Sequence, residues 1–542
     1  MALGLLAYVL IFGRGVRLEE FGVHSLHVSW RPCDGTIGCR WTHQRPPEGA
    51  DGLLGPALAQ FLRDIEKMRR GAEYISEISM DGRAVFLDGE RVPDVTAHPG
   101  FSAPVRVIAS LYDLSINTRD ITYQLDGASH SAMWLPPKSG ADLATRLRVH
   151  RHWAEGTFGL MGRTPDHVAS LVTAFAAGRH VFDRSSRRFG DNVVSFYEKA
   201  RDNDLYVCYA VTPPQVDRSK PAHEQPEPYL YPGIVSERDD GVVVRGAQMI
   251  GSAAAIADYL LLSYIVPLQP GDEDYAISVV MPIAADGLRI YPRRPYASSA
   301  TSRFDYPLSS RFDESDSLIV LRDVFIPWEH VFVHRDIRLV NAQFHETGAH
   351  LLASYQALVH FLVKMEFACG LAIELADAHG LSGISPVQAQ LGGDIAAFCS
   401  ALEALVLAAG ARPEMRGDLA LPSSTFVYSG MSLQRRWVVD LMRALRELGG
   451  GGVIAMPSSE ESFDAMETAD DVERYYRSAT ASARERVKLL KLMWDLVGTE
   501  FGGRQLQYEM FSSSAQHIAD LRVFRSYDWD VGREHVRRSL ED

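Results

Sequence analysis

The sequence has few cysteines and no excess of positive charge. Among 542 residues the cysteines are an odd number, are scattered and include no CxxC pair, which argues against a disulfide framework and a structural zinc site. This usage predicts a reducing, cytoplasmic compartment. With 69 acidic and 55 basic residues, for a formal net charge of −14, the chain lacks the basic face typical of nucleic-acid-binding proteins. The five cysteines are Cys33, Cys39, Cys208, Cys369 and Cys399.

The sequence also lacks a long hydrophobic run near its N-terminus. The segment from Leu3 to Phe12 is apolar but too short to span a bilayer, and it lacks the basic start and cleavage site of a signal peptide. Residues 13–55 are rich in Gly, Pro, Arg and Trp without periodicity. We therefore expect residues 1–67 to be a poorly ordered extension, a more natural start at Met68, and no membrane attachment.

Several common catalytic motifs are missing. There is no GxGxxG between a strand and a helix, no P-loop, no HExxH and no GxSxG. The run Gly449–Gly452 follows a helical pattern, so we interpret it as a helix stop rather than a phosphate cradle. His150 and His152, with Arg146 and Arg148 on the same segment, indicate a solvated basic helix face rather than metal ligands. Generic motifs alone therefore name no reaction.

Hydrophobic periodicity divides the chain after the extension into three parts. Over residues 68–204 apolar side chains recur at helical spacing, as at Val105 and Ile108. Over residues 205–338 short runs rich in β-branched and aromatic residues are separated by Gly, Pro and Asp. Over residues 339–542 the helical period returns with broad apolar surfaces, typical of a bundle and an oligomer interface. We predict a mainly helical α+β protein with an N-terminal helical domain, a middle β domain and a C-terminal bundle.

Distinctive segments stand in a fixed order from residue 69 to the end. They are RRGAEYISEI from Arg69, DGERVPDVTAHPGF from Asp88, GLMGRTPD from Gly159, TPPQVDRSKP from Thr212, FDYPLSSRFDESD from Phe304, FIPWEHVFV from Phe325 and RERVKLLKLMWDLVGTEFGGRQLQYE from Arg484. Together they resemble the large oxygenase component of the 4-hydroxyphenylacetate 3-hydroxylase family. The sequence is most similar in character to members that hydroxylate carrier-tethered tyrosine derivatives in antibiotic pathways.

The resemblance implies an acyl-CoA-dehydrogenase-like fold, with a helical N-domain, a β-barrel-like middle domain and a C-terminal helical bundle, assembled as a homotetramer or homodimer. It also implies a two-component monooxygenase in which a separate flavin reductase supplies reduced FAD. Through a C4a-hydroperoxyflavin, a phenolic ring is hydroxylated ortho to its hydroxyl, in natural-product biosynthesis or aromatic catabolism. The phenol is free or carrier-tethered. The protein orients the ring, favours the phenolate and excludes water.

Three residues are implied to contact the phenol. Arg163 matches the family's substrate-contacting arginine, whose guanidinium donates to the phenol oxygen and favours the phenolate; alternatively it binds a carboxylate such as Asp166. His167 stands where the family usually has a tyrosine, and Tyr209 where it usually has a histidine, so the two residue types are exchanged. His167 follows a Thr164-capped helix start, where a neutral imidazole is expected. Alternatively, the two positions have drifted and the site is altered or inactive.

Further contacts follow from the same resemblance. Tyr264 and Ile265 are implied to line the substrate pocket, although strand packing explains them nearly as well. No metal ligand is expected. The positions implied to contact FAD are Tyr209, Ala210, Val211, Gln215, Val216, Asp217, Arg218, Ser252, Ala515, Gln516, His517 and Ile518.

Other functions of this fold fit less well. A 4-hydroxybutyryl-CoA dehydratase needs three cysteines and a histidine for an iron–sulfur cluster, and no cysteine lies between Cys39 and Cys208. An acyl-CoA dehydrogenase needs a catalytic carboxylate, for which no motif is present. A family member that oxidises a different aromatic compound, or a non-catalytic flavin-binding scaffold, remains open as the alternative.

Overall fold

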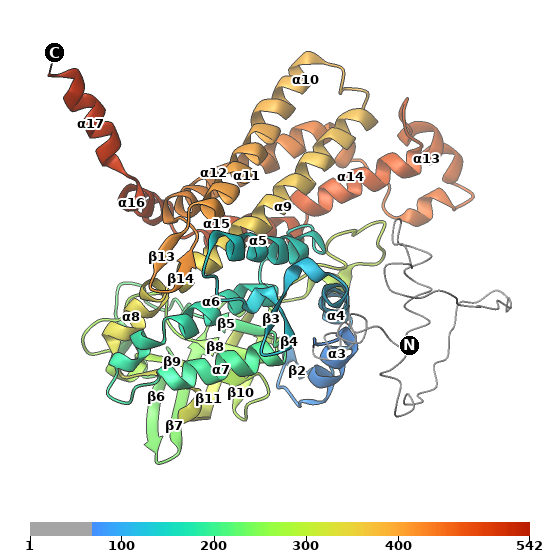
Figure 1. Cartoon of the computed structure of the whole chain (residues 1–542). Helices are drawn as coiled ribbons and strands as arrows, with labels where there is room; N and C mark the ends of the chain where they lie inside the picture. The colour runs from blue at the N-terminus through green and yellow to red at the C-terminus, as the bar shows by residue number, and fades with distance from the viewer. Residues whose placement is uncertain (1–67, 542) are drawn as a thin grey trace, which may run out of the picture. The chain divides into compact units, whose positions relative to one another are not determined.

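The computed structural model describes residues 68–541, so the predicted extension, residues 1–67, lies outside the described residues. Arg69–Gln124 and His130–Asp542 form one compact unit, which is described here by itself. Within it helices come first, strands follow and helices return, which is the predicted order (Figure 1). The boundaries near residues 204 and 338 remain predictions, because the segments on either side belong to the same unit.

The most deeply buried of the N-terminal helices is α6 (Pro165–Ala177). Every residue from Pro165 to Phe175 is buried, and the helix packs against α7 and α9. A proline in the first turn starts it, as the sequence predicts. A helix enclosed on all sides needs a partner for each polar side chain that it carries. The other N-terminal elements are α3 (Gly71–Met80), β1 (Phe86–Leu87), β2 (Glu90–Arg91), α4 (Ser102–Ile116), β3 (Thr122–Leu125), β4 (Ala128–Ser131), α5 (Gly140–Glu155) and α7 (Gly190–Asp202).

The β-rich middle part consists of two four-stranded sheets, in the orders β10-β11-β7-β6 and β12-β9-β8-β5. β5 and β8 are parallel, whereas the other neighbours in these sheets are antiparallel. β9 is buried along almost its whole length, as its apolar run predicts. The strands are β5 (Val207–Ala210), β6 (Gly233–Arg238), β7 (Gly241–Gln248), β8 (Tyr259–Leu262), β9 (Ile277–Pro282), β10 (Leu288–Pro292), β11 (Ser317–Pro327) and β12 (Val331–His334).

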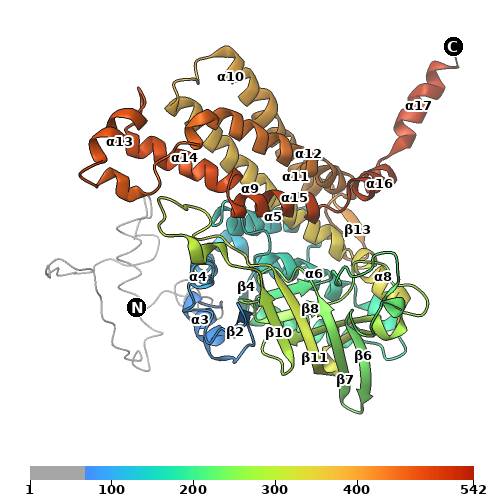
Figure 2. The same cartoon turned by 180° about the vertical axis from the view of Figure 1, so that it is seen from behind.

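The C-terminal helices lie on one side of the sheets, and α9 (Ala349–Ala378) connects them to the N-terminal helices (Figures 1 and 2). α9 is mostly buried and packs against α5, α6, α11 and α12. At the C-terminus α17 has no buried residue and projects away from its neighbours. The remaining elements are α8 (Ile337–Glu346), α10 (Ser385–Gln390), a π-helical turn (Leu391–Ala396), α11 (Ala397–Ala411), β13 (Glu414–Arg416), β14 (Leu419–Leu421), α12 (Ser424–Gly449), α13 (Ala469–Tyr476), α14 (Ala483–Val497), α15 (Glu500–Ser512), α16 (Gln516–Ser526) and α17 (Trp529–Ser539).

The glycine run after α12 behaves as predicted. The helix ends at Gly449, and the next residue, Gly450, has a φ of +55°, a conformation that glycine adopts without strain. A single turn of 3₁₀ helix, Gly450–Val453, follows and reverses the chain. The run is therefore a helix stop.

One helical stretch among the described residues, Ser385–Ala411, is long and apolar enough to cross a membrane, judged by length and composition alone. Its α11 part packs against α9 and α12. A single stretch of this kind is weak evidence for a membrane span. The absence of membrane attachment therefore remains a prediction.

The loop between α5 and α6 approaches α9 so closely that it requires a glycine. Gly159 has a φ of +68°, and a Cβ atom there would lie 2.3 Å from the carbonyl oxygen of His360 and 2.6 Å from the amide nitrogen of Lys364. Both of these are backbone atoms of a buried helix and cannot move away independently. Gly159 therefore holds the segment that leads to Arg163 against α9.

We expect Gly159→Ala to destabilise the protein by roughly 2–5 kcal/mol, because it adds both backbone strain and overpacking. The measurement is thermal unfolding followed by circular dichroism. Gly503→Ala is the matched control: this glycine lies inside α15, and nothing lies within 4 Å of a Cβ added there. The control should change stability by at most about 1 kcal/mol, in the favourable direction. Similar midpoints for the two variants would contradict the close approach.

Candidate active site

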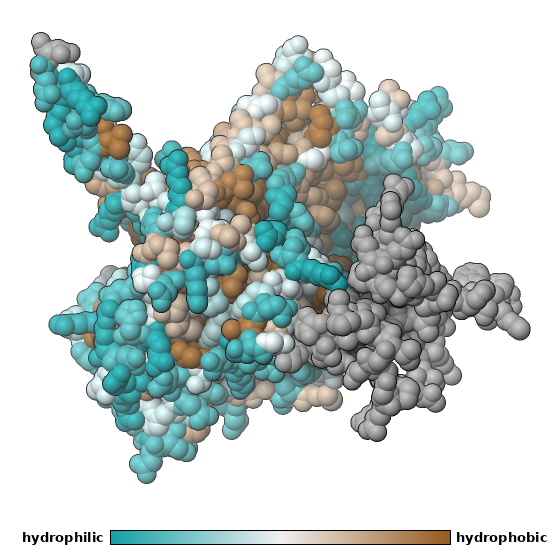
Figure 3. Space-filling view, viewed as in Figure 1, coloured by the Kyte–Doolittle hydropathy of each residue, from teal (hydrophilic) through white to brown (hydrophobic). Residues whose placement is uncertain are grey.

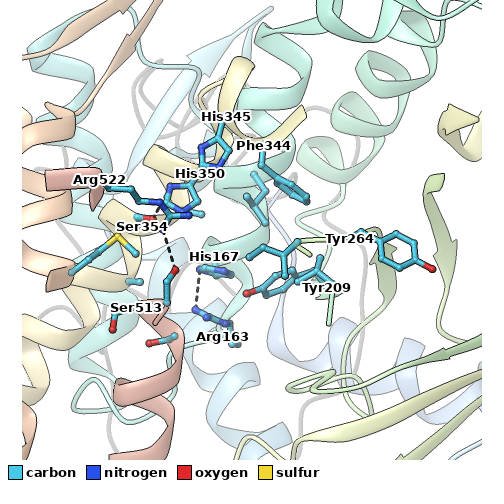
Figure 4. Close-up of a pocket in the computed structure, with 18 of the residues that line it drawn as sticks. Arg163, His167, Tyr209, Tyr264, Phe344, His345, His350, Ser354, Ser513 and Arg522 are labelled. Carbon is cyan, nitrogen blue, oxygen red and sulfur yellow. Dashed lines mark hydrogen bonds between the residues drawn. The ribbon is translucent and has the colours of Figure 1, made fainter. Parts of the chain in front are cut away.

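A cavity of about 140 Å³ lies where α6, β5, α8, α9 and α12 meet the segment after α15 (Figure 4). Residues more than 300 positions apart in the chain line it together, from Arg163 to Arg522. Two arginines and three histidines line the cavity, and among the described residues no aspartate or glutamate does so. The predicted site residues among its lining are Arg163, His167, Tyr209, Val211, Tyr264 and Ile265.

Arg163 is held at the cavity by its backbone and by two aromatic rings. Its amide N–H donates to Glu314 Oε1 at 2.5 Å, and its guanidinium lies 5.5 Å from the ring centre of Tyr209 and 5.1 Å from that of Tyr508. Burial opposes the charge, but Tyr209, Tyr508 and Glu314 outweigh it and raise the pKa of Arg163 above its ordinary value. The predicted alternative, an ion pair with Asp166, is not formed. Among the described residues no carboxylate pairs with this guanidinium.

Asp166 is a fully buried carboxylate in the first turn of α6. Its Oδ2 accepts from His150 Nδ1 at 2.8 Å and from His360 Nε2 at 3.3 Å. Its Oδ1 accepts from Thr164 Oγ1 at 2.6 Å. Burial would raise the pKa of Asp166, but His360 and His150 hold it below its usual range. Thr164 therefore occupies the N-cap position without making the capping bond that the sequence predicts, because its hydroxyl is directed to Asp166.

His360 and His150 each contact Asp166 through one ring nitrogen and differ in the surroundings of the other. His360 Nδ1 lies 3.1 Å from the carbonyl oxygen of Met161, so both ring nitrogens of His360 face acceptors, an arrangement that an imidazolium satisfies. Burial lowers the pKa of His150 to about 4, so this ring is neutral and donates from Nδ1. Both histidines thus direct one ring nitrogen at a single buried anion.

The prediction of a solvated basic face over Arg146–His152 is wrong for its inner residues. Arg146 and His150 are fully buried, whereas Arg148 is exposed. Arg146 donates to Ser170 Oγ at 2.6 Å and to the carbonyl oxygen of Met133 at 3.0 Å. These partners come from other segments, which explains why the charge pattern of α5 alone is misleading.

The hydrogen bonds of His167 determine its tautomer. Gln356 Nε2 lies 3.3 Å from Asp166 Oδ1, and because a carboxylate only accepts, the amide group must face Asp166 with its nitrogen. Gln356 Oε1 then faces His167 Nδ1 at 2.7 Å, and Arg163 Nη1 lies 3.4 Å from the same nitrogen. The much shorter contact with Gln356 places the proton on Nδ1, so Nε2 keeps its lone pair. Burial and the neighbouring Arg163 lower the pKa of His167 well below its ordinary value. The ring is a neutral hydrogen-bond acceptor at Nε2.

Tyr209, on β5, lies beside His167. The two ring centres are 5.3 Å apart, and Figure 4 shows the Tyr209 hydroxyl directed toward the side of the cavity that holds Arg163 and His167. Among the described residues this hydroxyl has no hydrogen-bond partner. The structure therefore brings Arg163, His167 and Tyr209 together.

Tyr264 and Ile265 contribute less to the cavity than these three residues do. The Tyr264 hydroxyl donates to the carbonyl oxygen of Pro232, and Figure 4 shows it pointing away from the other labelled residues. Ile265 is 55% exposed. The hydroxyl of Tyr264 therefore serves packing, as the alternative predicts, whereas its ring forms part of the cavity wall.

The residues predicted to contact FAD divide into those with free donors and those already bonded. Gln215 and Arg218 are exposed and have no hydrogen-bond or ion-pair partner among the described residues. Their loop is anchored by Gln225, whose Nε2 donates to the carbonyl oxygen of Asp217 at 2.9 Å. Ser252 instead donates to Asp316 Oδ1 at 2.6 Å.

The last predicted FAD segment begins α16. Ala515 is its N-cap residue, His517 and Ile518 are exposed, and Gln516 donates to Asp520 Oδ1 at 2.7 Å. None of these four residues, nor Gln215, Val216, Asp217, Arg218 or Ser252, lines the cavity.

The sequence analysis missed the residues that support the site from α9. Gln356, His360 and Lys364 recur every four positions in a mostly apolar stretch of α9, which places them on one face. All three are buried, and Lys364 Nζ donates to Gln505 Oε1 at 2.8 Å and pairs with Glu509. A polar stripe at this spacing in a buried helix is the signal that could have identified them.

Models of one protein family match nearly all of the described chain. A model described as "4-hydroxyphenylacetate 3-hydroxylase N terminal" matches residues 70–333, and one described as "4-hydroxyphenylacetate 3-hydroxylase C terminal" matches residues 340–541. The chain belongs to the 4-hydroxyphenylacetate 3-hydroxylase family. The family resemblance predicted from the sequence is therefore confirmed, and the chain is an oxygenase component of a two-component flavin-dependent monooxygenase.

Individual relatives agree with the family. The oxygenase component of 4-hydroxyphenylacetate 3-monooxygenase from Thermus thermophilus is 32% identical over 88% of this chain and 98% of its own length. A Streptomyces globisporus monooxygenase named for a (3S)-3-amino-3-(3-chloro-4-hydroxyphenyl)propanoyl group on a peptidyl-carrier protein is 34% identical over 81% of this chain and 84% of its own.

Solved structures give the same result for the fold. A 4-hydroxyphenylacetate 3-monooxygenase oxygenase component, complexed with FAD and 4-hydroxyphenylacetate, superposes with a TM-score of 0.82 at 32% identity, covering 87% of this chain and 98% of that one. An archaeal 4-hydroxybutyryl-CoA dehydratase has a TM-score of 0.79 at 20% identity, covering 88% and 95% of the two chains, and shares the fold. The predicted acyl-CoA-dehydrogenase-like fold is confirmed.

We expect Asp166→Asn to destabilise the protein by about 3–5 kcal/mol, because it removes the charge that His360 and His150 oppose and turns an N–H group toward other donors. Thermal unfolding measures the change. Asp120→Asn is the control, since Asp120 is exposed, lies 3.7 Å from Arg148 and should contribute at most about 1 kcal/mol. If both variants unfold at the wild-type midpoint, Asp166 does not hold the site together.

Proposed function

We propose that this chain hydroxylates a phenolic ring ortho to its hydroxyl, with O₂ and with reduced FAD that a separate flavin reductase supplies. Three groups that meet at one cavity support the proposal most strongly. They are the permanent cation of Arg163, the neutral imidazole of His167 and the hydroxyl of Tyr209, which has no hydrogen-bond partner among the described residues. These are the groups that recognise a phenol and stabilise its anion. The names of the relatives support the same reaction.

Each residue then has a defined part in the chemistry. His167 Nε2 accepts a hydrogen bond from the hydroxyl of the bound phenol, because its lone pair is free and its Nδ1–H is held by Gln356. Arg163 keeps its charge throughout and stabilises the phenolate oxygen, which makes the ortho carbon more nucleophilic. Tyr209 donates a second hydrogen bond to that oxygen. The apolar part of the lining, including Leu171 and Phe344, limits the access of water.

The donor groups of the chain fit FAD at two places. Tyr209 and Ala210 end β5 and Val211 follows it, and Tyr209 and Val211 line the cavity where the flavin ring would meet the substrate. The exposed loop that follows offers the free amide of Gln215 and the unpaired guanidinium of Arg218, which suit polar edges and phosphate. Reduced FAD supplies the activated oxygen when it is bound. The segment Ala515–Ile518 fits less well, because the amide of Gln516 is already bonded.

We place the chain in the cytoplasm, in natural-product biosynthesis or aromatic catabolism, and we propose that it forms a homotetramer or homodimer. Apolar side chains gather on the surface over the C-terminal helices (Figure 3). Among them Ile373, Leu407 and Val439 are each more than 40% exposed, on α9, α11 and α12. A contact between copies of the chain would bury this surface.

Arg163→Ala should lower hydroxylation efficiency on the order of ten- to hundredfold, the effect of losing a charged hydrogen bond of about 1.5–3 kcal/mol. Oxygen consumption should continue and release peroxide, because the predicted FAD contacts lie on other segments. The assay compares hydroxylated product with oxygen consumed, with reductase-supplied FADH₂. Arg148→Ala, at an exposed arginine of α5, is the control. Normal coupling in Arg163→Ala would make this arginine purely structural.

His167 and Tyr209 should act as one exchanged pair around the phenol oxygen. His167→Tyr and Tyr209→His would each place two like groups against one oxygen, so each single change should reduce product formed per flavin oxidised. The double variant should recover part of the loss, which is the non-additivity expected of groups that share a partner. Strictly additive losses across the four proteins would show that the two side chains do not cooperate. Absence of hydroxylated product from all four proteins, the wild type included, with flavin still bound, would favour an altered or inactive site.

A further inference from the structure

The cavity has a second polar group at the end away from Arg163. His345 near the end of α8, His350 in the first turn of α9 and Arg522 of α16 gather there, as Figure 4 shows. The ring centres of the two histidines are 4.8 Å apart, and that of His350 lies 5.8 Å from the ring of Tyr428. These residues come from three separate helices, so the cluster exists only in the folded chain.

Arg522 lacks the carboxylate partner that a partly buried arginine usually has. Its Nη1 donates to Ser514 Oγ at 3.0 Å and its guanidinium lies 5.9 Å from the ring of Tyr428. Among the described residues it forms no ion pair. By contrast, Arg504 on the preceding helix pairs with both Glu314 and Asp316. A cavity lined by this arginine and by no acidic residue is electrostatically suited to an anion.

The two histidines add hydrogen-bonding groups rather than charge. Burial, together with the nearby Arg522, lowers the pKa of both His345 and His350, so both rings are neutral. Burial also lowers the pKa of Arg522 itself, which is the behaviour of a cation without a counterion. An entering carboxylate would meet one guanidinium, two imidazoles and the hydroxyls of Ser354 and Ser514.

We infer that Arg522, His345 and His350 form an anion-binding subsite that selects substrates by a negatively charged group on the side chain of the phenol. The inference rests on the proposed function, which places the phenol oxygen at Arg163. With the ring anchored at Arg163 and the anion at Arg522, the substrate is fixed at both ends, and this determines which ring carbon faces the oxidant. An arginine fork suits a carboxylate through two parallel hydrogen bonds.

The test is a binding measurement that needs no turnover. Equilibrium dialysis gives the Kd of 4-hydroxyphenylacetate and of 3-(4-hydroxyphenyl)propanoate, each beside its own uncharged primary amide. These pairs differ in charge and hardly in size. In the wild-type protein at least one acid should bind on the order of ten- to hundredfold more tightly than its amide.

Arg522→Gln should abolish this preference while leaving the affinity for the amides within about twofold, and Arg522→Lys should retain part of it. Arg525→Gln is the matched control, since Arg525 is an exposed arginine on the same helix that does not line the cavity. Thermal unfolding checks that each variant is folded.

Three results would overturn the inference. In the first, neither acid is preferred over its amide by the wild-type protein. In the second, the preference survives in folded Arg522→Gln. In the third, Arg522→Gln weakens FAD binding and leaves the acids unaffected, so that the anion recognised is the cofactor's phosphate. Failure of the proposed function looks different: the acids bind as expected, but no hydroxylated product forms with reductase-supplied FADH₂.

Discussion

The buried carboxylate of Asp166 is the group on which the arrangement of the site depends. A lone carboxylate in this position would be strongly unfavourable, so the fold must surround it with donors. His150 from α5 and His360 from α9 contact one oxygen, and Thr164 and Gln356 contact the other. Because these donors come from two helices, α5 and α9, and from the residue before α6, they fix the first turn of α6, and with it Arg163 and His167, in relation to α9.

The same network places a charged side chain, Arg163, beside a neutral one, His167. Arg163 is charged and has no carboxylate partner among the described residues, whereas His167, four residues later, is held neutral by burial and by the neighbouring charge of Arg163. A fixed cation beside a neutral acceptor binds the hydroxyl of a phenol and favours negative charge on its oxygen. With histidine at 167 and tyrosine at 209, the site holds one imidazole and one phenolic hydroxyl beside Arg163.

The sequence was sufficient to predict the order of helices and strands, the start of α6 at Thr164-Pro165 and the grouping of Arg163, His167 and Tyr209. Local periodicity and an ordered set of motifs carry that information. It was not sufficient for His150, because nothing in α5 shows that a carboxylate sixteen residues later is buried against it. Gln356 and Arg522 were also missed. Their roles depend on contacts between segments that no spacing within one helix reveals.

The central claim is that His167 is a neutral acceptor whose Nδ1 proton is held by Gln356. The most direct measurement is the pH dependence of hydroxylated product formed per flavin oxidised, between pH 8 and pH 6. With the pKa of His167 well below its ordinary value, the ring stays neutral over this range and the yield should stay constant. A histidine with the ordinary pKa of about 6.5 would be roughly three-quarters protonated at pH 6. A yield that falls with a midpoint near pH 6.5, and that becomes independent of pH in His167→Tyr, would contradict the account.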